Sequence, residues 1–226
     1  WARYTDLAPG PARMQLARMF RKLAYLILAL GPVVPAQVVA QDAPSAPPAH
    51  QHHHTGLPEL RPIPEGALYT GADVEFMQGM IAHHAQAIEM SRLAEARGAD
   101  ARLLRFARKI DQSQESEIQL MQGWLVDHGQ AIPDSASYRT VTMPGMLTAG
   151  EMQQLAGANG RNFDRLFLEL MIKHHEGAIG MVADLMASPG AAQDVDVNVF
   201  ANEVEIVQSA EIDLMHQMLA DLQGDP

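Results

Sequence analysis

The sequence predicts an all-α protein, a four-helix bundle built from two repeated antiparallel helical hairpins. Three observations predict it: a segment that occurs twice, the helical spacing of its apolar residues, and a weaker repeat that follows each copy. The segment Phe76–Met90 returns 91 positions later as Phe167–Met181, and both copies read Phe, Met, His-His, Ala-Ile, Met. Two amphipathic hairpins that cannot bury their apolar faces alone would close into a bundle with a pseudo-twofold axis.

The start of the chain has the layout of a secretory signal peptide. Basic residues precede the apolar run Leu23–Leu30, and the small residues Val38-Val39-Ala40 offer a cleavage site before Gln41. The alternative interpretation is a membrane anchor. We therefore expect a signal peptide over residues 1–40 and a periplasmic or secreted protein.

Charge and cysteine content restrict the function. Removing residues 1–40 takes away five of the 16 basic and one of the 27 acidic residues, which leaves a formal charge of −15. Such a surface repels nucleic acid and anionic lipid and favours cations. The absence of Cys excludes disulfides and thiolate metal sites, so that methionine is the soft ligand that remains.

The mature chain divides into a linker and one helical domain. Residues 41–70 are rich in Pro, Ala and His and predict a flexible linker, whose tract His50–His54 either binds divalent metal loosely or is simply solvated. The bundle domain follows over residues 71–226, with repeat one at 71–129, a crossover at 130–160 and repeat two at 161–222.

Turn and capping residues set the expected helices. Asp73 and Gly98 mark the ends of the first helix, and Asp100 caps the second, which runs to about 128–129. Thr148 and Glu151 match a capping box for a short helix to about 156. The remaining helices are expected over about 161–186 and 197–222, and the Gln-x-x-Glu-Ile segment of the second helix returns in the last one, 94 positions later.

Polar residues on the apolar helix faces are the candidate site. His84 and His175 lie in the middle of these faces, whereas His83 and His174 lie at the edge, about a quarter turn away. Glu117 and Glu211 lie on the facing stripes of the second and fourth helices and are the obvious partners, since an unpaired buried polar group costs roughly 1–3 kcal/mol. Two structural alternatives stay open: buried His–Glu pairs that only fix register, and edge histidines that are merely exposed.

Ligand softness favours copper among the metals. Imidazole with thioether and without thiolate suits copper, Cu(I) in particular for methionine. A di-iron bundle would carry a Glu on each of two helices and a Glu-x-x-His motif on each of the other two, and neither His pair has a Glu three residues before it. The predicted ligands are Met77, Met80, His83, His84, Met90, Met171, His174, His175, Met181, Glu117 and Glu211, with no catalytic residue.

These residues resemble a known family. The segments Phe76–Met90 and Asp164–Met181, with the Gln-x-x-Glu-Ile segments, resemble the domain of unknown function family 305, secreted or periplasmic four-helix proteins that include CopM-like copper-binding, copper-resistance proteins. The resemblance covers about residues 70–222. It implies a ferritin-like fold and a Met/His copper site. Leu168 stands where the first copy has Met77, which argues against symmetric ligation there.

The main functional hypothesis is an exported, non-enzymatic protein that sequesters, buffers or chaperones copper in the cell envelope, with the metal ion as its partner. The alternatives are a ferritin-like metal-dependent oxidase or peroxidase and a structural or interaction bundle without metal. The sequence leaves enzymatic activity and homo-oligomer formation open.

Overall fold

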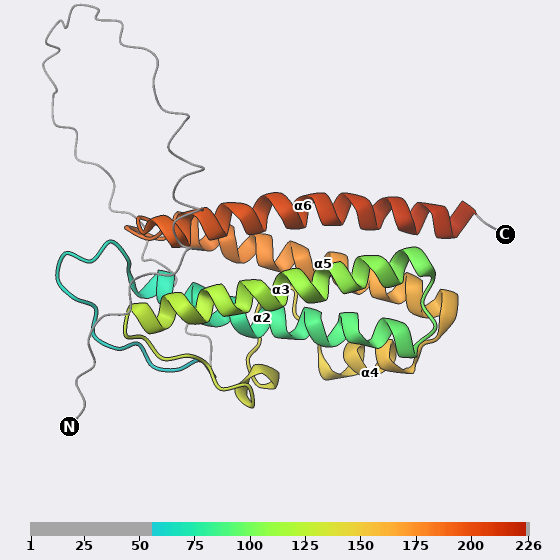
Figure 1. The fold of residues 1–226 in the computed structure, drawn as a ribbon, viewed down its shortest axis with the longest axis horizontal. Coiled ribbons are helices and arrows are strands. Elements are labelled where there is room, and N and C mark those ends of the chain that lie inside the picture. Colours follow the sequence, from blue (N-terminus) through green and yellow to red (C-terminus); the bar gives the residue numbers. More distant parts are fainter. Residues whose placement is uncertain (1–55, 225–226) are drawn as a thin grey trace, which may run out of the picture. The chain divides into compact units, whose positions relative to one another are not determined.

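The protein is all-α, as expected. A computed structural model describes residues 56–224, so the expected signal peptide and the histidine tract lie outside the described residues. The helices are α2 (Gly71–Ala96), α3 (Ala101–Asp127), α4 (Ala149–Gly157), α5 (Gly160–Ala187) and α6 (Val195–Gly224), with a 3-10 turn η2 (Ser137–Arg139) before α4 (Figure 1). Each helix begins and ends within two residues of its expected position.

The helix ends carry the capping residues that the sequence indicated. Asp100 accepts a hydrogen bond from the Arg102 amide at the start of α3, and Thr148 and Glu151 form the capping box of α4. Gly98 adopts a positive φ of 66°, which lets the chain leave α2 and enter α3 within four residues. This short turn makes α2 and α3 an antiparallel hairpin.

The four long helices have a ferritin-like topology. α2 packs on α3, α5 packs on α6, and α2 packs on α5 (Figure 1). α2 and α5 are antiparallel, because Asp73 at the start of α2 bonds the amide of Ala192, beyond the end of α5, while Arg97 at the end of α2 bonds Gly160. α3 and α5 therefore run in the same direction, so the crossover must return along the whole bundle.

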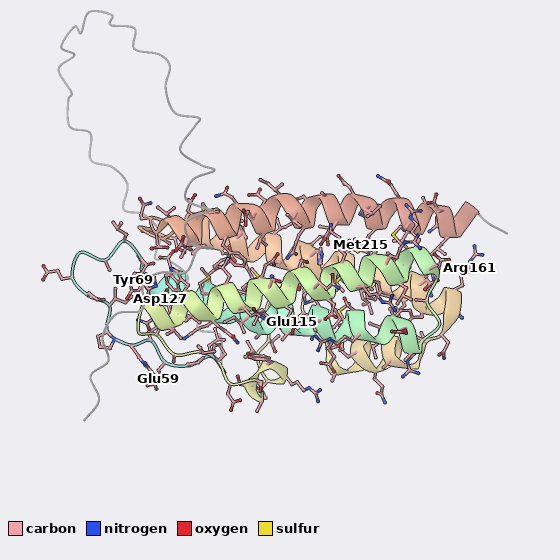
Figure 2. All side chains as sticks on the ribbon, viewed as in Figure 1. Glu59, Tyr69, Glu115, Asp127, Arg161 and Met215 are labelled. Carbon is pink, nitrogen blue, oxygen red and sulfur yellow. The ribbon has the colours of Figure 1, made fainter. Side chains whose placement is uncertain are left out.

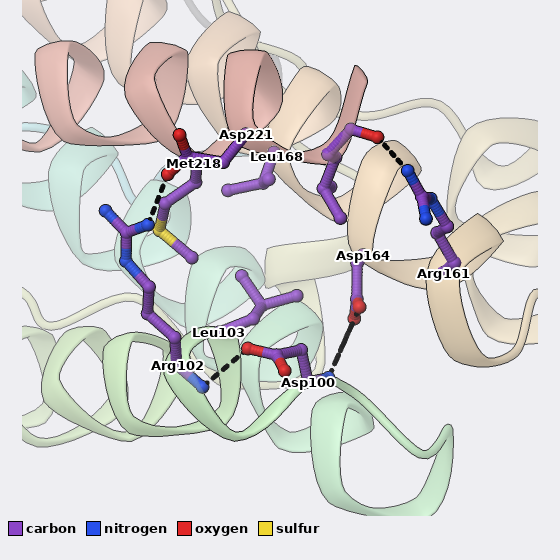
Figure 3. A pocket seen from close by; sticks show the side chains of 9 residues that line it. Asp100, Arg102, Leu103, Arg161, Asp164, Leu168, Met218 and Asp221 are labelled. Carbon is purple, nitrogen blue, oxygen red and sulfur yellow. Dashed lines mark hydrogen bonds and ion pairs between the residues drawn. The ribbon is translucent and has the colours of Figure 1, made fainter. Parts of the chain in front are cut away.

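Two aspartates clamp the hairpins together at opposite ends of the bundle. Asp73 Oδ1 accepts a hydrogen bond from the Ala192 amide at 2.7 Å, just before α6. Asp164, 91 positions after Asp73, accepts one from the Asp100 amide at 3.2 Å, at the start of α3 (Figure 3). Each hairpin's first helix thus holds the start of the other hairpin's second helix, which is how the sequence repeat becomes a pseudo-twofold structure.

The apolar core consists of two clusters with a polar layer between them. One cluster gathers around Met80, Trp124 and Phe200, and the other around Phe106, Phe163 and Phe167. Both clusters take side chains from both repeats, so neither hairpin has a complete core of its own. The layer between them contains buried polar residues from all four long helices: His83, His84, Gln114, His174, His175, Gln208 and Glu211.

Residues 56–70 differ from the flexible linker that was expected there. Tyr69 is buried, and Leu57 and Ile63 pack against the core cluster around Met80. The Arg61 amide donates to Gln130 Oε1 at 3.0 Å. A few apolar residues within a Pro-rich segment are thus enough to seat it on the bundle. Among the described helices, none combines the length and apolarity that a membrane crossing needs.

Candidate metal centre

The four histidines of the doubled motif are all buried in the polar layer. His83, His84 and His175 have no exposed surface, and His174 is 1% exposed. α2 supplies the first pair and α5 the second, and because these helices are antiparallel neighbours, the pairs meet near the pseudo-twofold axis. Consecutive residues on a helix point about 100° apart. Each pair therefore has one inner histidine, facing α3 or α6, and one outer histidine.

The inner histidines are paired with the glutamates that the sequence indicated. His84 Nε2 lies 2.6 Å from Glu117 Oε2, and His175 Nε2 lies 2.9 Å from Glu211 Oε2. The pairs differ in burial, since the Glu117 side chain is 30% exposed and that of Glu211 is 5% exposed. The predicted pairing is confirmed, but the two repeats do not provide equivalent surroundings.

The second pair has a further charged neighbour, Lys109, which the repeat did not indicate. Lys109 Nζ lies 3.3 Å from Glu211 Oε1, without an aligned hydrogen bond. Burial by itself raises the pKa of Glu211, but the hydrogen bond and charge of His175 together with Lys109 outweigh it and leave this pKa below its ordinary value. Position 203 on α6, the counterpart of 109, is a glutamate, so the repeat gives Glu117 no matching lysine.

The outer histidines contact each other across the seam between α2 and α5. The ring centroids of His83 and His174 are 3.8 Å apart, with the planes inclined at 41°. His83 Nε2 donates a hydrogen bond to the Pro144 carbonyl at 3.0 Å, since a carbonyl oxygen can only accept. The alternative that these two residues are exposed edge histidines is wrong, because the crossover covers the seam.

The crossover reaches the seam at two glycines. A Cβ atom on Gly177 would lie 2.1 Å from the Pro144 carbonyl oxygen, so only glycine admits the crossover backbone at this point of α5. Gly145 adopts a φ of 77°, and a Cβ atom on it would lie 2.7 Å from the Lys173 carbonyl oxygen of α5. Gln86, at the position of repeat one that matches Gly177, holds the next part of the crossover by two hydrogen bonds to the Leu147 backbone, at 2.7 and 3.0 Å.

Burial keeps the outer histidines neutral. Desolvation is the main cause that lowers the pKa of His83 to about 3, with a further contribution from His84. Desolvation also holds the pKa of His174 well below its ordinary value, followed by the charges of His83, His175 and His84. Neutral imidazole is the form that binds metal ions.

Several nitrogen atoms of this layer have no hydrogen-bond partner although they are fully buried. They are the Nδ1 atoms of His83, His84 and His175. The fourth histidine, His174, lies close enough to the His83 backbone for a hydrogen bond that acts against the lowering of its pKa. For His83 the tautomer follows from its neighbours: Nε2 carries the proton that it donates to Pro144, so Nδ1 presents a free lone pair. The inner histidines, when neutral and donating Nε2–H to their glutamates, present Nδ1 in the same way.

The predicted sulfur ligands are buried but lie in two groups. Met77, Met80 and Met181 belong to the cluster around Met80, whereas Met90 and Met171 belong to the cluster on the other side of the histidine layer. Met215, labelled on α6 in Figure 2, is also fully buried. The structure thus places thioethers on both sides of the histidines and does not gather the five predicted methionines at one point.

The described residues contain no group of three or more His, Asp or Glu side chains arranged to hold a metal ion. The two His–Glu pairs are therefore separate pairs and not one carboxylate-rich centre. A pocket lined by Asp100, Asp164 and Asp221 lies at the end of the bundle where α2 ends and α5 begins (Figure 3). Its charged side chains already have partners: Arg102 pairs with Asp221 at 2.6 Å, and Asp164 accepts a hydrogen bond from the Asp100 amide. The pocket contains no residue of the polar layer.

Fold and site together define a ferritin-like four-helix protein with two buried pairs of consecutive histidines. The chain belongs to the family described as Domain of unknown function (DUF305), whose profile matches residues 73–219. No match was found among curated proteins.

Several solved structures share the fold. A Streptomyces coelicolor member, described as a candidate secreted protein, is 30% identical with a TM-score of 0.60, and the match covers 67% of this chain and 94% of that one. A fragment from Deinococcus radiodurans is 28% identical with a TM-score of 0.58, covering 68% and 98% of the two chains. CopM, solved with Cu(II) and with Cu(I), is 28% identical with a TM-score of 0.53, covering 66% and 96%.

Proposed function

We propose that this protein binds Cu(I) through its two consecutive-histidine pairs and nearby thioethers, and that it sequesters, buffers or passes on copper in the cell envelope. The observation that carries the proposal is the set of buried histidine nitrogens without a partner. Each such group costs roughly 1–3 kcal/mol when it stays unsatisfied. A metal ion accepts the lone pair of a neutral imidazole and removes that cost.

The groups around the inner histidines are those expected around metal ligands. A metal-bound histidine usually donates its second ring nitrogen to a carboxylate or a carbonyl, which fixes the ring and its tautomer. Glu117 and Glu211 occupy that position for His84 and His175, and the Pro144 carbonyl occupies it for His83. In this arrangement Nδ1 is the ligand atom, and the glutamates orient the ligands without binding the metal themselves.

The choice of Cu(I) rests on the donor set. Structural zinc sites and di-iron bundles require three or more His, Cys, Asp or Glu ligands, and the described region gathers no such group. Thioethers and neutral imidazoles are present instead, and these suit Cu(I). The relative CopM has been solved with Cu(I), with Cu(II) and with silver, which supports a copper function for this chain as well.

The test is a competition titration of the metal-free protein with Cu(I) and with Zn(II) at pH 7, under anaerobic and reducing conditions. The protein is purified without a nickel column and carries alanine at His50, His52, His53 and His54, so that the tract cannot bind the probe. We expect Cu(I) to bind more tightly than Zn(II), because zinc gains little from thioethers.

Two matched variants test whether Cu(I) binds in the polar layer. His84→Gln should weaken Cu(I) binding, whereas His216→Gln, at an exposed position on α6, should bind as the parent protein does. Tighter binding of zinc would contradict the proposal. Turnover of a reduced substrate by protein reconstituted with iron or copper would favour the oxidase or peroxidase alternative.

A further inference from the structure

We propose that the crossover supplies a sulfur ligand: Met143, together with Met181 of α5, binds the Cu(I) that His83 holds. The predicted ligands all lie on the four long helices, and Met143 is not among them. The inference rests on the proposed function and adds a third structural element to the site. The candidate sulfur atoms lie beside Gly79, which is one turn before His83 on α2.

Two thioether side chains converge on Gly79. A Cβ atom at this position would lie 2.9 Å from Met143 Sδ and 3.4 Å from the terminal methyl carbon of Met181. Glycine is therefore what allows the sulfur of Met143 to lie against the α2 backbone. At the matching position of repeat two stands Leu170, so the repeat is broken where the crossover methionine reaches the bundle.

The same segment is tied to His83. Met143 directly precedes Pro144, whose carbonyl accepts the Nε2–H of His83 at 3.0 Å. Side chains on a helix lean toward its N-terminus, so the His83 ring leans toward the turn that contains Gly79. The hydrogen bond, the lean of the ring and the contact of Met143 with Gly79 bring one imidazole and two thioethers into the same region.

The side chains of this region are buried, and one of them has a nitrogen lone pair without a partner. Met143 is 4% exposed, Met181 is 7% exposed and His83 is fully buried. His83 Nδ1 has no partner, although a buried acceptor without one is costly. Imidazole with two thioethers is a soft donor set, which selects Cu(I) over harder ions.

The alternative is that Met143 only fills the gap above Gly79, as methionine often does in irregular cores. Met→Leu substitution separates the two roles, because it removes the sulfur and nearly conserves volume. Loss of an outer contact to a metal ligand costs about 10–100-fold in affinity. Loss of a ligand should therefore cost at least about tenfold.

The experiment measures Cu(I) affinity by competition with a chromogenic chelator, and the ligand atoms by copper X-ray absorption, in the full chain with the tract substitutions given above. Met143→Leu and Met181→Leu are each expected to weaken Cu(I) binding at least about tenfold and to reduce the sulfur contribution to the absorption spectrum. Met218→Leu is the matched control: Met218 is 5% exposed but lies on α6 at the far end of the bundle, and this variant should match the parent in both measurements.

A second variant keeps the test valid if Met143→Leu folds poorly. Gly79→Ala places a Cβ atom 2.9 Å from Met143 Sδ, so that this sulfur must move away. The end of a methionine side chain can move in this way without unfolding the protein. It should therefore weaken Cu(I) binding and the sulfur signal while the helical circular dichroism is retained. If Met143→Leu and Gly79→Ala bind Cu(I) as the parent does while His83→Gln binds it weakly, the inference is overturned and the proposed function stands. If the parent itself binds no Cu(I), both are overturned.

Discussion

The two His–Glu pairs should make unequal contributions to the stability of the metal-free protein. Glu211 is almost fully buried and contacts both His175 and Lys109, whereas the Glu117 side chain is 30% exposed and contacts His84. The perturbation that exposes this difference is Glu211→Ala compared with Glu117→Ala. Both substitutions remove the acceptor of a buried histidine, but only the second leaves an opening through which water can replace it.

The magnitudes follow from these surroundings. Glu211→Ala strands the buried Nε2–H of His175, which costs about 1–3 kcal/mol, and removes one buried methylene at about 0.8 kcal/mol. The contact with Lys109, whose side chain is 64% exposed, adds at most about 1 kcal/mol. We expect a total loss of about 2–5 kcal/mol, against about 0.5–1.5 kcal/mol for Glu117→Ala.

The assay is thermal unfolding followed by circular dichroism at pH 7 in the presence of a chelator. Each kcal/mol lowers Tm by about 2–4 °C for a protein of this size, so that Glu211→Ala should unfold roughly 4–20 °C below the parent and Glu117→Ala only a few degrees below it. Glu205→Ala, at an exposed position on α6, controls for the change of residue type and should stay within about 0.5 kcal/mol of the parent. Equal losses for the two pair variants would refute the reasoning from burial.

Two further predictions concern the outer histidines and their cover. The lowered pKa values of His83 and His174 mean that the unfolded chain binds protons that the native state does not, so stability is fully present above about pH 6.5 and is lost as pH falls from there. The His83 imidazole, whose pKa falls to about 3, should cost about 2 kcal/mol between pH 6.5 and 5. The measurement is the urea midpoint of the metal-free protein, whose fall over this pH range should be smaller in His83→Gln. An unchanged pH dependence in that variant would contradict the assignment. Gly177→Ala should displace the crossover, lower the free energy of unfolding by about 1–3 kcal/mol and speed amide exchange at residues 143–147. The control is Gly180→Ala, where a Cβ meets nothing within 4 Å and the free energy of unfolding should rise by about 0.5–1 kcal/mol. Similar effects of the two substitutions would show that the close contact at Gly177 is unimportant.

Much of the fold could be predicted because its signals are local and occur twice. Helical periodicity, Gly98, Asp100 and the Thr148 capping box determine where helices begin and end, and the repeat indicates that two hairpins share one core. The pairing of His84 with Glu117 followed from the same periodicity, since both residues stand in the middle of apolar stripes. These features depend on spacing within a single helix, which the sequence displays directly.

The surroundings of the outer histidines could not be predicted in this way. Helical spacing placed His83 and His174 at the edge of an apolar face, and an edge position is exposed unless another segment covers it. The covering segment is an irregular crossover without periodicity, and the residues that seat it, Gly145 and Gly177, become significant only when the backbones are seen in contact. The contact of Met143 with Gly79 could not be predicted for the same reason.

On the proposed function, the departures from symmetry predict that the two histidine pairs bind Cu(I) with unequal affinity. The four histidines repeat, but their surroundings differ: Lys109 contacts Glu211 and not Glu117, and Met143 contacts Gly79, for which repeat two has Leu170. A neighbouring cation disfavours the approach of a metal ion, while an added thioether favours Cu(I). The stronger Cu(I) site should therefore be the one that contains His83, and binding should proceed in two steps of different affinity. Met143→Leu should bring the two steps closer together, because it weakens only the tighter one.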